Sequence, residues 1–377
     1  MIIRYFVKQN YFQMKIKDTL AILEEMAPLG YAESFDNVGL LVGDSNANLT
    51  GILVCHDALE AVIDEAITNN CNLVVCFHPI LFGGLKKITG KNYVERAVIK
   101  AIKNDVAVYA VHTALDNHKD GVNKIFCDAL GIENSKVLIP KENYIQKLVT
   151  YTVSDNAEKL RNALFDAGAG NIGNYEDCSF SSQGIGTYMG NENSNPEVGS
   201  QFEFVEAKEI KIEVTFEKHL QSKIIKALFS NHVYEEVAYE IYNIENKHQN
   251  IGLGRVGSLK NALSESDFLQ LISEKLDCKG IRHSQFLGKP IKKVAVLGGS
   301  GSYAIKNAIA SGADAYLTAD LKYHQFYEAE NQLLLADIGH FESERFTKNY
   351  IVDYLKEKIT NFAIILSQEN TNPVKYF

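Results

Sequence analysis

The spacing of apolar residues along this chain switches repeatedly between that of a helix and that of a buried strand. A helix is expected where apolar residues recur on one helical face, and a strand where short β-branched runs occur. In the first third of the sequence the expected elements alternate as helix 16–26, strand 51–58, helix 59–70, strand 71–79, helix 94–104 and strand 106–113. Such alternation predicts an α/β fold built on a mainly parallel sheet with right-handed crossovers.

The pattern changes in the middle of the chain. From about residue 141 the expected order is strand and helix, then a polar hairpin or loop, then strand, helix and strand, which is the order of a ferredoxin-like α+β module. The earlier alternation returns from about residue 248. We therefore predict an insert at 141–247 and one α/β domain formed jointly by 1–140 and 248–377, since 377 residues suit more than one hydrophobic core.

Composition limits the kinds of molecule that the protein is expected to bind and the cell compartment in which it is expected to occur. The net charge is −9 and acidic and basic residues are interspersed, which argues against binding to nucleic acid or to anionic membranes. No apolar run approaches the roughly 20 residues of a membrane span. Six cysteines without CxxC spacing favour reduced core thiols and a cytoplasmic protein. Residues 1–13 lack the order of a signal peptide and are expected to be disordered or to precede a natural start at Met14.

The stretch VVCFHPILFGGLKKI places a histidine at the end of an expected strand. Val74 and Val75 belong to the strand, and Pro79 can neither extend it nor donate to its ladder. His78 therefore lies at the carboxyl end, where ligands bind in open α/β sheets. Considered alone, this residue is better explained as a half-buried histidine that bonds to a loop carbonyl.

Two further strand ends carry histidine or carboxylate. One expected strand ends at His112 and is followed by a loop with Asp116 and His118. Another is followed by His340 and Glu344, which share one face of the first turn if the chain is helical there. A single long helix is expected from Glu342 to about Lys358.

Each of these residues alone also has a structural explanation, such as helix capping or a hydrogen bond to a loop. Together they predict a site for a divalent cation, because mixed imidazole and carboxylate ligands suit hard and borderline cations. The expected metal ligands are His78, Asp116, His340 and Glu344, whereas His118 is expected to be solvated.

Other stretches give weaker signals. GGSGSYAI predicts either an anion-binding turn or simply a tight turn. TADLKYH follows a strand and puts Asp320 and His324 near the same rim, so His324 is a candidate acid or base. Asp36 is interpreted as a structural turn residue that could lie near the site. His56 ends a strand and is expected to form a hydrogen bond there rather than to bind metal.

The chain contains, in this order, FDNVGLLVGD, FHPILFGGLKK, VHTALDNHKDGVN, GGSGS, TADLKYH and DIGHFESE. As a set these stretches resemble the Nif-three-like dinuclear-metal family, whose members are often named GTP cyclohydrolase I type 2 homologues. The resemblance covers about residues 14–140 and 250–370, and the middle of the chain resembles the PII-like or CutA-like insert of longer members. It implies a toroidal homohexamer with the metal sites facing an internal cavity.

The resemblance also implies a pair of divalent cations. Their ligands would be two adjacent histidines, the aspartate of an HTxxD motif, and the histidine and glutamate of a GHxxSE motif. These positions fall on Phe77 and His78, Asp116, His340 and Glu344. Phe77 departs from the pattern and is expected to pack without binding metal.

The loss of a histidine at position 77 predicts two unequal metal sites. One tight site keeps His78, Asp116 and Glu344. The second, weaker site retains His340 and the shared Glu344, and water or a neighbouring histidine, His112 or His324, completes it.

The sequence thus predicts a metal-dependent hydrolase that acts on a nucleotide-like or phosphorylated small molecule. Zinc, iron, manganese or magnesium would activate water, Glu344 would fix the metal, and His324 would carry the proton. The family name suggests opening of the GTP ring, but the sequence identifies no guanine-binding residues. The alternative is a noncatalytic hexameric regulator or scaffold in which the PII-like insert senses a ligand.

Overall fold

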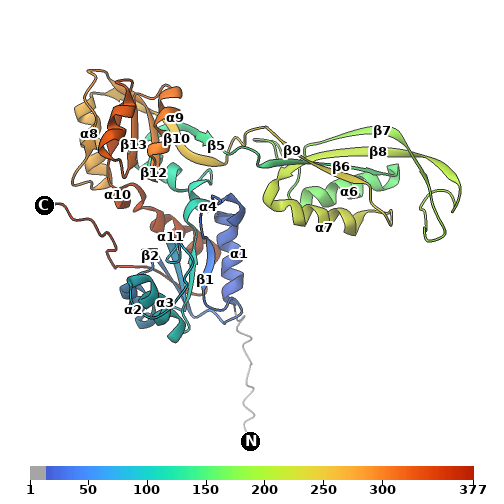
Figure 1. The fold of residues 1–377 in the computed structure, drawn as a ribbon, viewed down its shortest axis with the longest axis horizontal. Coiled ribbons are helices and arrows are strands. Elements are labelled where there is room, and N and C mark those ends of the chain that lie inside the picture. Colours follow the sequence, from blue (N-terminus) through green and yellow to red (C-terminus); the bar gives the residue numbers. More distant parts are fainter. Residues whose placement is uncertain (1–13) are drawn as a thin grey trace, which may run out of the picture. The chain divides into compact units, whose positions relative to one another are not determined.

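The computed structural model describes residues 14–377, and the expectations about residues 1–13 lie outside that range. The chain forms two compact units. Unit 1 combines the N-terminal segment up to Ile139 with Gly252–Phe377, and unit 2 is Pro140–Ile251 (Figure 1). No helix among the described residues is long and apolar enough to cross a membrane.

The first sheet of unit 1 has a parallel core. Its strands lie in the order β1 (Gly39–Val42), β4 (Ala107–Ala110), β3 (Leu73–His78), β2 (Gly51–Asp57) and β15 (Ala363–Leu366). Only the β1–β4 pair of this sheet is antiparallel. β2 and β3 are almost continuously apolar because helices cover both faces of the sheet. One face packs on α1 (Ile16–Met26) and α11 (Thr347–Lys358), and the other on α2 (Glu60–Thr68) and α3 (Tyr93–Lys103).

The second sheet of unit 1 also has parallel strands at its centre. Its order is β11 (Arg282–His283), β14 (Leu334–Asp337), β13 (Ala315–Ala319), β12 (Ile291–Ser300), β10 (Gly252–Leu263) and β5 (Ile132–Pro140). β12, β13 and β14 are parallel, β10 is antiparallel to β12, and β11 is antiparallel to β14. Its faces are covered by α5 (Val122–Leu130) and α8 (Glu265–Leu276), and by α9 (Ile305–Ala310) with the 3₁₀ helix η4 (Tyr323–Ala329). The predicted α/β class is confirmed, but the strands divide between two sheets.

Two local expectations were wrong, and both concern the metal-type residues. The strand expected to end at His112 ends at Ala110, and the short helix α4 (His112–Asp116) replaces the expected loop. The single long helix expected from Glu342 to about Lys358 is two helices, α10 (His340–Glu344) and α11. The break lets Phe346 pack against the core of the second sheet while α11 packs on the first sheet.

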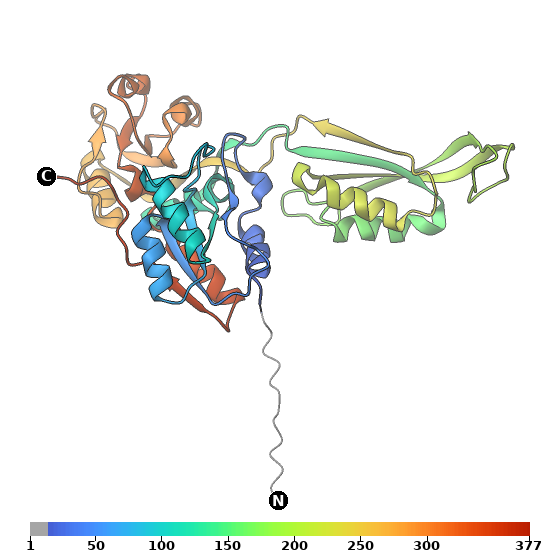
Figure 2. The same ribbon diagram turned by 60° about the horizontal axis from the view of Figure 1, so that its bottom comes forward.

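Unit 2 is an antiparallel sheet with two helices on one face. Its elements are β6 (Ile145–Thr152), α6 (Ser154–Asp166), β7 (Ser179–Met189), β8 (Phe204–Glu217), the short η2 (Lys218–Leu220), α7 (Gln221–Asn231) and β9 (Tyr239–Ile244). The strand order is β7-β8-β6-β9, and α6 and α7 lie side by side (Figures 1 and 2). This is the element order of a split β-α-β module. The similarity of this unit to PII-like proteins stays a prediction.

Candidate metal centre

Three side chains from distant parts of the sequence converge at the carboxyl ends of the strands of unit 1. His78 ends β3, and His340 and Glu344 lie one turn apart on α10, which follows β14. His78 Nε2 and His340 Nε2 are each 3.3 Å from Glu344 Oε2. The two Nε2 atoms are 3.4 Å apart. The three ligand-type atoms therefore form an almost equilateral triangle.

Both imidazole rings are held from behind by carboxylates. Asp57, at the end of β2, lies 2.8 Å from His78 Nδ1, and Asp320 lies 2.6 Å from His340 Nδ1. Asp57 also accepts a hydrogen bond of 2.5 Å from Thr371 Oγ1. A carboxylate on Nδ1 fixes the tautomer and the orientation of a metal-binding histidine, so that Nε2 faces the metal. Both rings of this site thus have the support that metal ligands usually receive.

The site concentrates charge around a buried carboxylate, that of Glu344. Burial favours the neutral form of Glu344, but hydrogen bonds to His340 and His78 outweigh this effect and hold the pKa of Glu344 well below its usual range. Burial disfavours protonated His78 and His340, yet hydrogen bonds to their carboxylate partners raise the pKa of His78 to about 9 and that of His340 to about 11. Two protonated rings with Nε2 atoms 3.4 Å apart repel each other. A single dication bound between them relieves this repulsion.

The triangle fits the coordination of zinc. Zinc binds histidine nitrogen and carboxylate oxygen at about 2.0–2.2 Å with tetrahedral angles, which places neighbouring ligand atoms roughly 3.3–3.5 Å apart. The observed separations of 3.3, 3.3 and 3.4 Å match one face of such a tetrahedron. The residues present therefore suit a divalent cation with mixed nitrogen and oxygen ligands.

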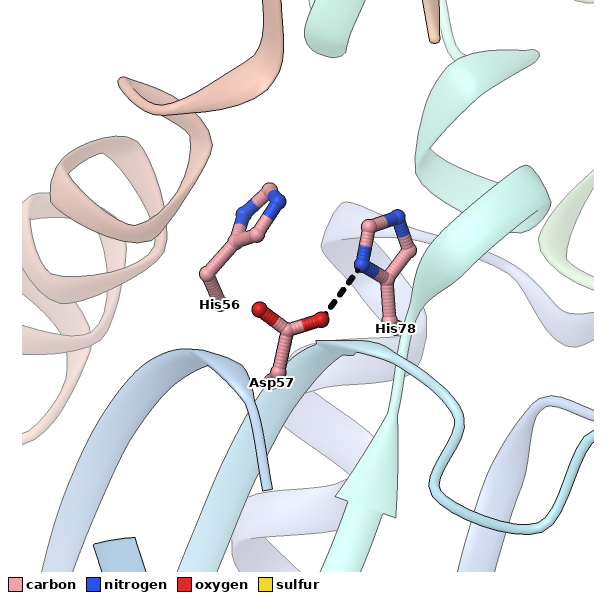
Figure 3. Close-up of side chains that lie close together, drawn as sticks. All are labelled: His56, Asp57 and His78. Carbon is pink, nitrogen blue, oxygen red and sulfur yellow. Dashed lines mark hydrogen bonds and ion pairs between the residues drawn. The ribbon is translucent and has the colours of Figure 1, made fainter. Parts of the chain in front are cut away.

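His56 also lies at this cluster, although the sequence did not predict it as a site residue. Its side chain is 3% exposed, and its Nε2 lies 3.7 Å from Glu344 Oε2. Within residues 14–377 neither ring nitrogen has a hydrogen-bond partner, so the expected hydrogen bond at the strand end was wrong. Burial lowers the pKa of His56 to about 4. His56, Asp57 and His78 form a second group of ligand-type side chains (Figure 3).

A signal for His56 was present in the sequence. His56 and Asp57 end one strand, and Phe77 and His78 end its parallel neighbour, with Asp57 paired to His78 in the register. Because side chains alternate between the faces of a sheet, His56 and Phe77 share one face, and Asp57 and His78 share the other. Phe77 is fully buried in the core on the α1 and α11 face, as its expected packing requires.

Asp116, a predicted ligand, is near the cluster but outside both groups of ligand-type side chains. It ends α4 and is half-buried, and its buried Oδ1 lacks a hydrogen-bond partner among the described residues. Burial, together with the nearby charge of Glu344, raises the pKa of Asp116. His112, at the start of α4, is held by Asp36 through a contact of 2.8 Å, so Asp36 acts as a structural residue beside the site.

The structure does not bring His324 into the cluster. His324 is exposed on η4, and its ring contacts Tyr323 and Tyr327. His118 stacks on Tyr31. Neither histidine belongs to the two groups of ligand-type side chains.

The turn GGSGS serves the site by making room for it. The amide of Gly298 donates to Asn123 Oδ1 and that of Gly299 donates to Ser343 Oγ, so these two amides already have protein partners. Gly299 has φ +68°, and a Cβ atom there would overlap Glu344 Oε1. Of the two interpretations of this stretch, the tight turn is therefore the better one.

A cavity of about 570 Å³ adjoins the cluster. His56, His78 and His340 line it, together with Asp57, Asp320, Asp337, Arg282, Glu342, Phe341, Gly280, Ile281, Gly339, Asn372, Pro373, Val374 and Tyr376. The C-terminal residues among them are tied to the site, because Asn372 Nδ2 donates to Glu342 Oε1 over 3.1 Å. A small molecule in this cavity would contact the imidazole cluster directly.

The chain is similar to known proteins along almost its whole length. Two proteins called GTP cyclohydrolase 1 type 2 homolog, from Bacillus subtilis and Halalkalibacterium halodurans, are 37% and 36% identical to it, and each match covers 95% of this chain and 97% of the relative. The crystal structure of a Bacillus cereus protein related to NIF3 has a TM-score of 0.83 at 35% identity and covers 97% of this chain and 100% of that one. The crystal structure of a Staphylococcus aureus protein has a TM-score of 0.76 at 28% identity, and the match covers 97% of this chain and 99% of that one.

The family itself is established by a match to its sequence model. The model described as Duf34/NIF3 (NGG1p interacting factor 3) matches residues 14–373. This match confirms the family resemblance read from the six sequence stretches. The chain belongs to the Duf34/NIF3 family.

Proposed function

We propose that this protein holds a divalent cation through His78, His340 and Glu344 and uses it to hydrolyse a nucleotide-like or phosphorylated small molecule. The observation that carries the proposal is the triangle of three ligand-type atoms with separations of 3.3, 3.3 and 3.4 Å beside a cavity of about 570 Å³. The names of the Bacillus subtilis and Halalkalibacterium halodurans relatives support a nucleotide as the substrate class.

Different residues of the chain have different roles at this site. Glu344 supplies a buried anion, and Asp57 and Asp320 keep Nε2 of His78 and His340 turned towards it. A bound divalent cation supplies Lewis acidity, which polarises a carbonyl or phosphoryl oxygen and acidifies water. His324 lies outside the cavity lining, so we assign it no step in the reaction.

The cavity also has groups suited to phosphate. Arg282, Asn372 and Tyr376 line it, and their guanidinium, amide and hydroxyl groups are hydrogen-bond donors. The same wall includes Asp337, which pairs with Arg282. A phosphorylated substrate would compete with Asp337 for the guanidinium and would approach the cation from this wall.

The first experiment is metal analysis. Protein stripped with a chelator is titrated with zinc, iron(II), manganese and magnesium, and the bound metal is counted by elemental analysis. We expect about one tightly bound cation per chain. The substitutions His78→Ala and Glu344→Gln should abolish this tight binding, and the matched surface variant His324→Ala should retain it. Equal binding by all three variants would overturn the proposed site.

The second experiment tests catalysis. Metal-loaded protein is screened against nucleotides and phosphoesters. Turnover should be absent in Glu344→Gln. In the wild-type chain, turnover should disappear when the metal is stripped and return when the metal is restored. A toroidal homohexamer, implied by the family resemblance, is part of the proposal, and sedimentation of a stable monomer would contradict it.

A noncatalytic regulator is the second candidate, and a feature of unit 2 favours it. A cavity of about 890 Å³ lies between the β7–β8 hairpin and the segment 190–197, and Tyr151, Lys211 and Tyr234 line it. A ligand bound there would make unit 2 a sensor. Tight binding of a metabolite by Tyr234-dependent contacts, with no turnover in the metal-loaded protein, would favour this candidate over the hydrolase.

A further inference from the structure

His56 is the one imidazole of the cluster without a carboxylate on its second nitrogen. Both ring nitrogens are buried, and neither has a hydrogen-bond partner within residues 14–377. Buried polar groups are normally satisfied, so an unpaired buried imidazole needs an explanation. The carboxylate oxygen Oε2 of Glu344 lies 3.7 Å from Nε2 of His56.

Neighbouring aromatic rings fix the plane of His56. Phe77, on the same face of the sheet, stacks on it with ring centroids 5.5 Å apart and an interplanar angle of 27°. Phe341 and His78 meet it edge-on, at 5.2 Å with 78° and at 4.6 Å with 71°. The ring is therefore held in one orientation by packing, and this orientation aims Nε2 at Glu344 rather than at a loop carbonyl.

Glu344 is approached by three imidazole nitrogens. Nε2 of His78 and of His340 are both 3.3 Å from Oε2, and Nε2 of His56 is 3.7 Å from the same oxygen. His78 and His340 already have the separations of two ligands in a tetrahedral site. Zinc and similar cations usually take about four protein or water ligands, so this triangle alone leaves a position to be filled.

We propose that His56 is itself a metal ligand, which binds through Nε2 to the cation that Glu344 holds and adds a third imidazole to those of His78 and His340. This inference rests on the proposed metal site. It explains why a nitrogen-bearing ring is buried with no protein partner, and it gives Phe77 a role: a side chain without a lone pair stacks on the ligand and positions it.

The direct test is zinc K-edge X-ray absorption of the metal-loaded protein. The spectrum counts coordinated imidazoles by their multiple scattering and needs no variant. We expect three imidazoles per zinc in the wild-type chain and two in His56→Phe, whose ring refills the space between Phe77 and Phe341. A wild-type count of two would overturn the inference.

The affinity for zinc gives an independent readout. Loss of an outer-shell partner of a metal ligand costs roughly 10–100-fold in affinity, so loss of a ligand should weaken binding by about 100-fold or more in His56→Phe. Phe77→Leu is the control, because it removes the stacked ring and leaves all ligands in place, and it should keep three imidazoles and lose much less affinity. Thermal melting of the metal-free proteins reports whether each variant is folded.

The outcomes separate the two proposals. Wild-type protein that takes up no divalent cation would overturn the proposed function and this inference together. Wild-type protein that binds zinc with two imidazoles, and a His56→Phe variant of unchanged affinity, would leave the proposed function standing and overturn only the role of His56.

Discussion

Asp57 Oδ1 lies 2.8 Å from Nδ1 of His78, and this contact joins the last residues of two parallel strands that are paired in register. The second oxygen of Asp57 accepts a hydrogen bond from Thr371, near the end of the described chain. The contact turns Nε2 of His78 away from Asp57 and towards Glu344. Asp57 is therefore a positioning residue of the candidate site.

Asp57→Asn should weaken zinc binding by about 10–100-fold, the range observed when an outer-shell carboxylate of a metal ligand is lost. Thr371→Val removes only the hydroxyl that supports Asp57 and should have a smaller effect. Competition with a chromophoric chelator measures both affinities. Unchanged affinity in Asp57→Asn would show that His78 needs no support from the carboxylate.

Gly299→Ala should damage both stability and metal binding. Gly299 has φ +68°, where an L side chain costs about 1–2 kcal/mol, and its added Cβ would overlap Glu344 Oε1. Gly288 is a matched control, because it has φ +69° and a Cβ there would meet nothing within 4 Å. Urea unfolding should show a comparable backbone cost in both variants, while titration with zinc should show weakened binding only in Gly299→Ala. Equal zinc affinity in the two variants would contradict the close approach of this turn to Glu344.

Asp36 should contribute to the dependence of stability on pH. Burial raises its pKa, but hydrogen bonds from His112 and Thr113 outweigh this effect and lower the pKa to about 2. Because the folded pKa lies below the unfolded value, the contribution of Asp36 is complete above about pH 4 and is lost as the pH falls towards 2.

Asp36→Asn tests this contribution. The substitution should cost about 1–3 kcal/mol at pH 7, where it removes hydrogen bonds to a charged acceptor, and should flatten the loss of stability between about pH 4 and pH 2. Asp128→Asn, which changes an exposed carboxylate paired with Lys124, is the control. Urea unfolding at each pH measures both effects, and parallel pH profiles for Asp36→Asn and the wild-type chain would refute the assignment.

Unit 1 should fold without unit 2. The backbone of Lys141 and that of Ile251 are hydrogen-bonded over 2.9 Å, and β5 and β10 are neighbours in the second sheet, so the two ends of the excised segment lie close together. Replacing 142–250 by a short Gly-Ser linker should leave cooperative thermal melting, followed by circular dichroism, and an unchanged zinc stoichiometry. A variant that melts without cooperativity would show that unit 1 depends on unit 2.

The sequence alone determined the local features of this protein. Periodicity predicted the strands β2, β3 and β4 of the first sheet and the helices α1, α2 and α3 that cover it, because the spacing of buried residues is set by the geometry of each element. It also located His78 at a strand end and His340 and Glu344 four residues apart, since a proline and a change of period mark those positions. The sequence did not predict the break between α10 and α11, because this break depends on the packing of Phe346 against the second sheet.

Only the tertiary structure decided which of these residues meet. His56 comes to Glu344 across 288 positions of sequence, Asp57 supports His78 through the register of two strands, and Asp320, which follows β13, supports His340 across 20 positions. Asp116 lies outside both groups of ligand-type side chains, and His324 is exposed at the surface. Local propensity contains no information on strand order, on register or on the division of the strands between two sheets. Strand order, register and the division into two sheets result from the packing of whole elements. They set the distances between side chains on which metal binding depends.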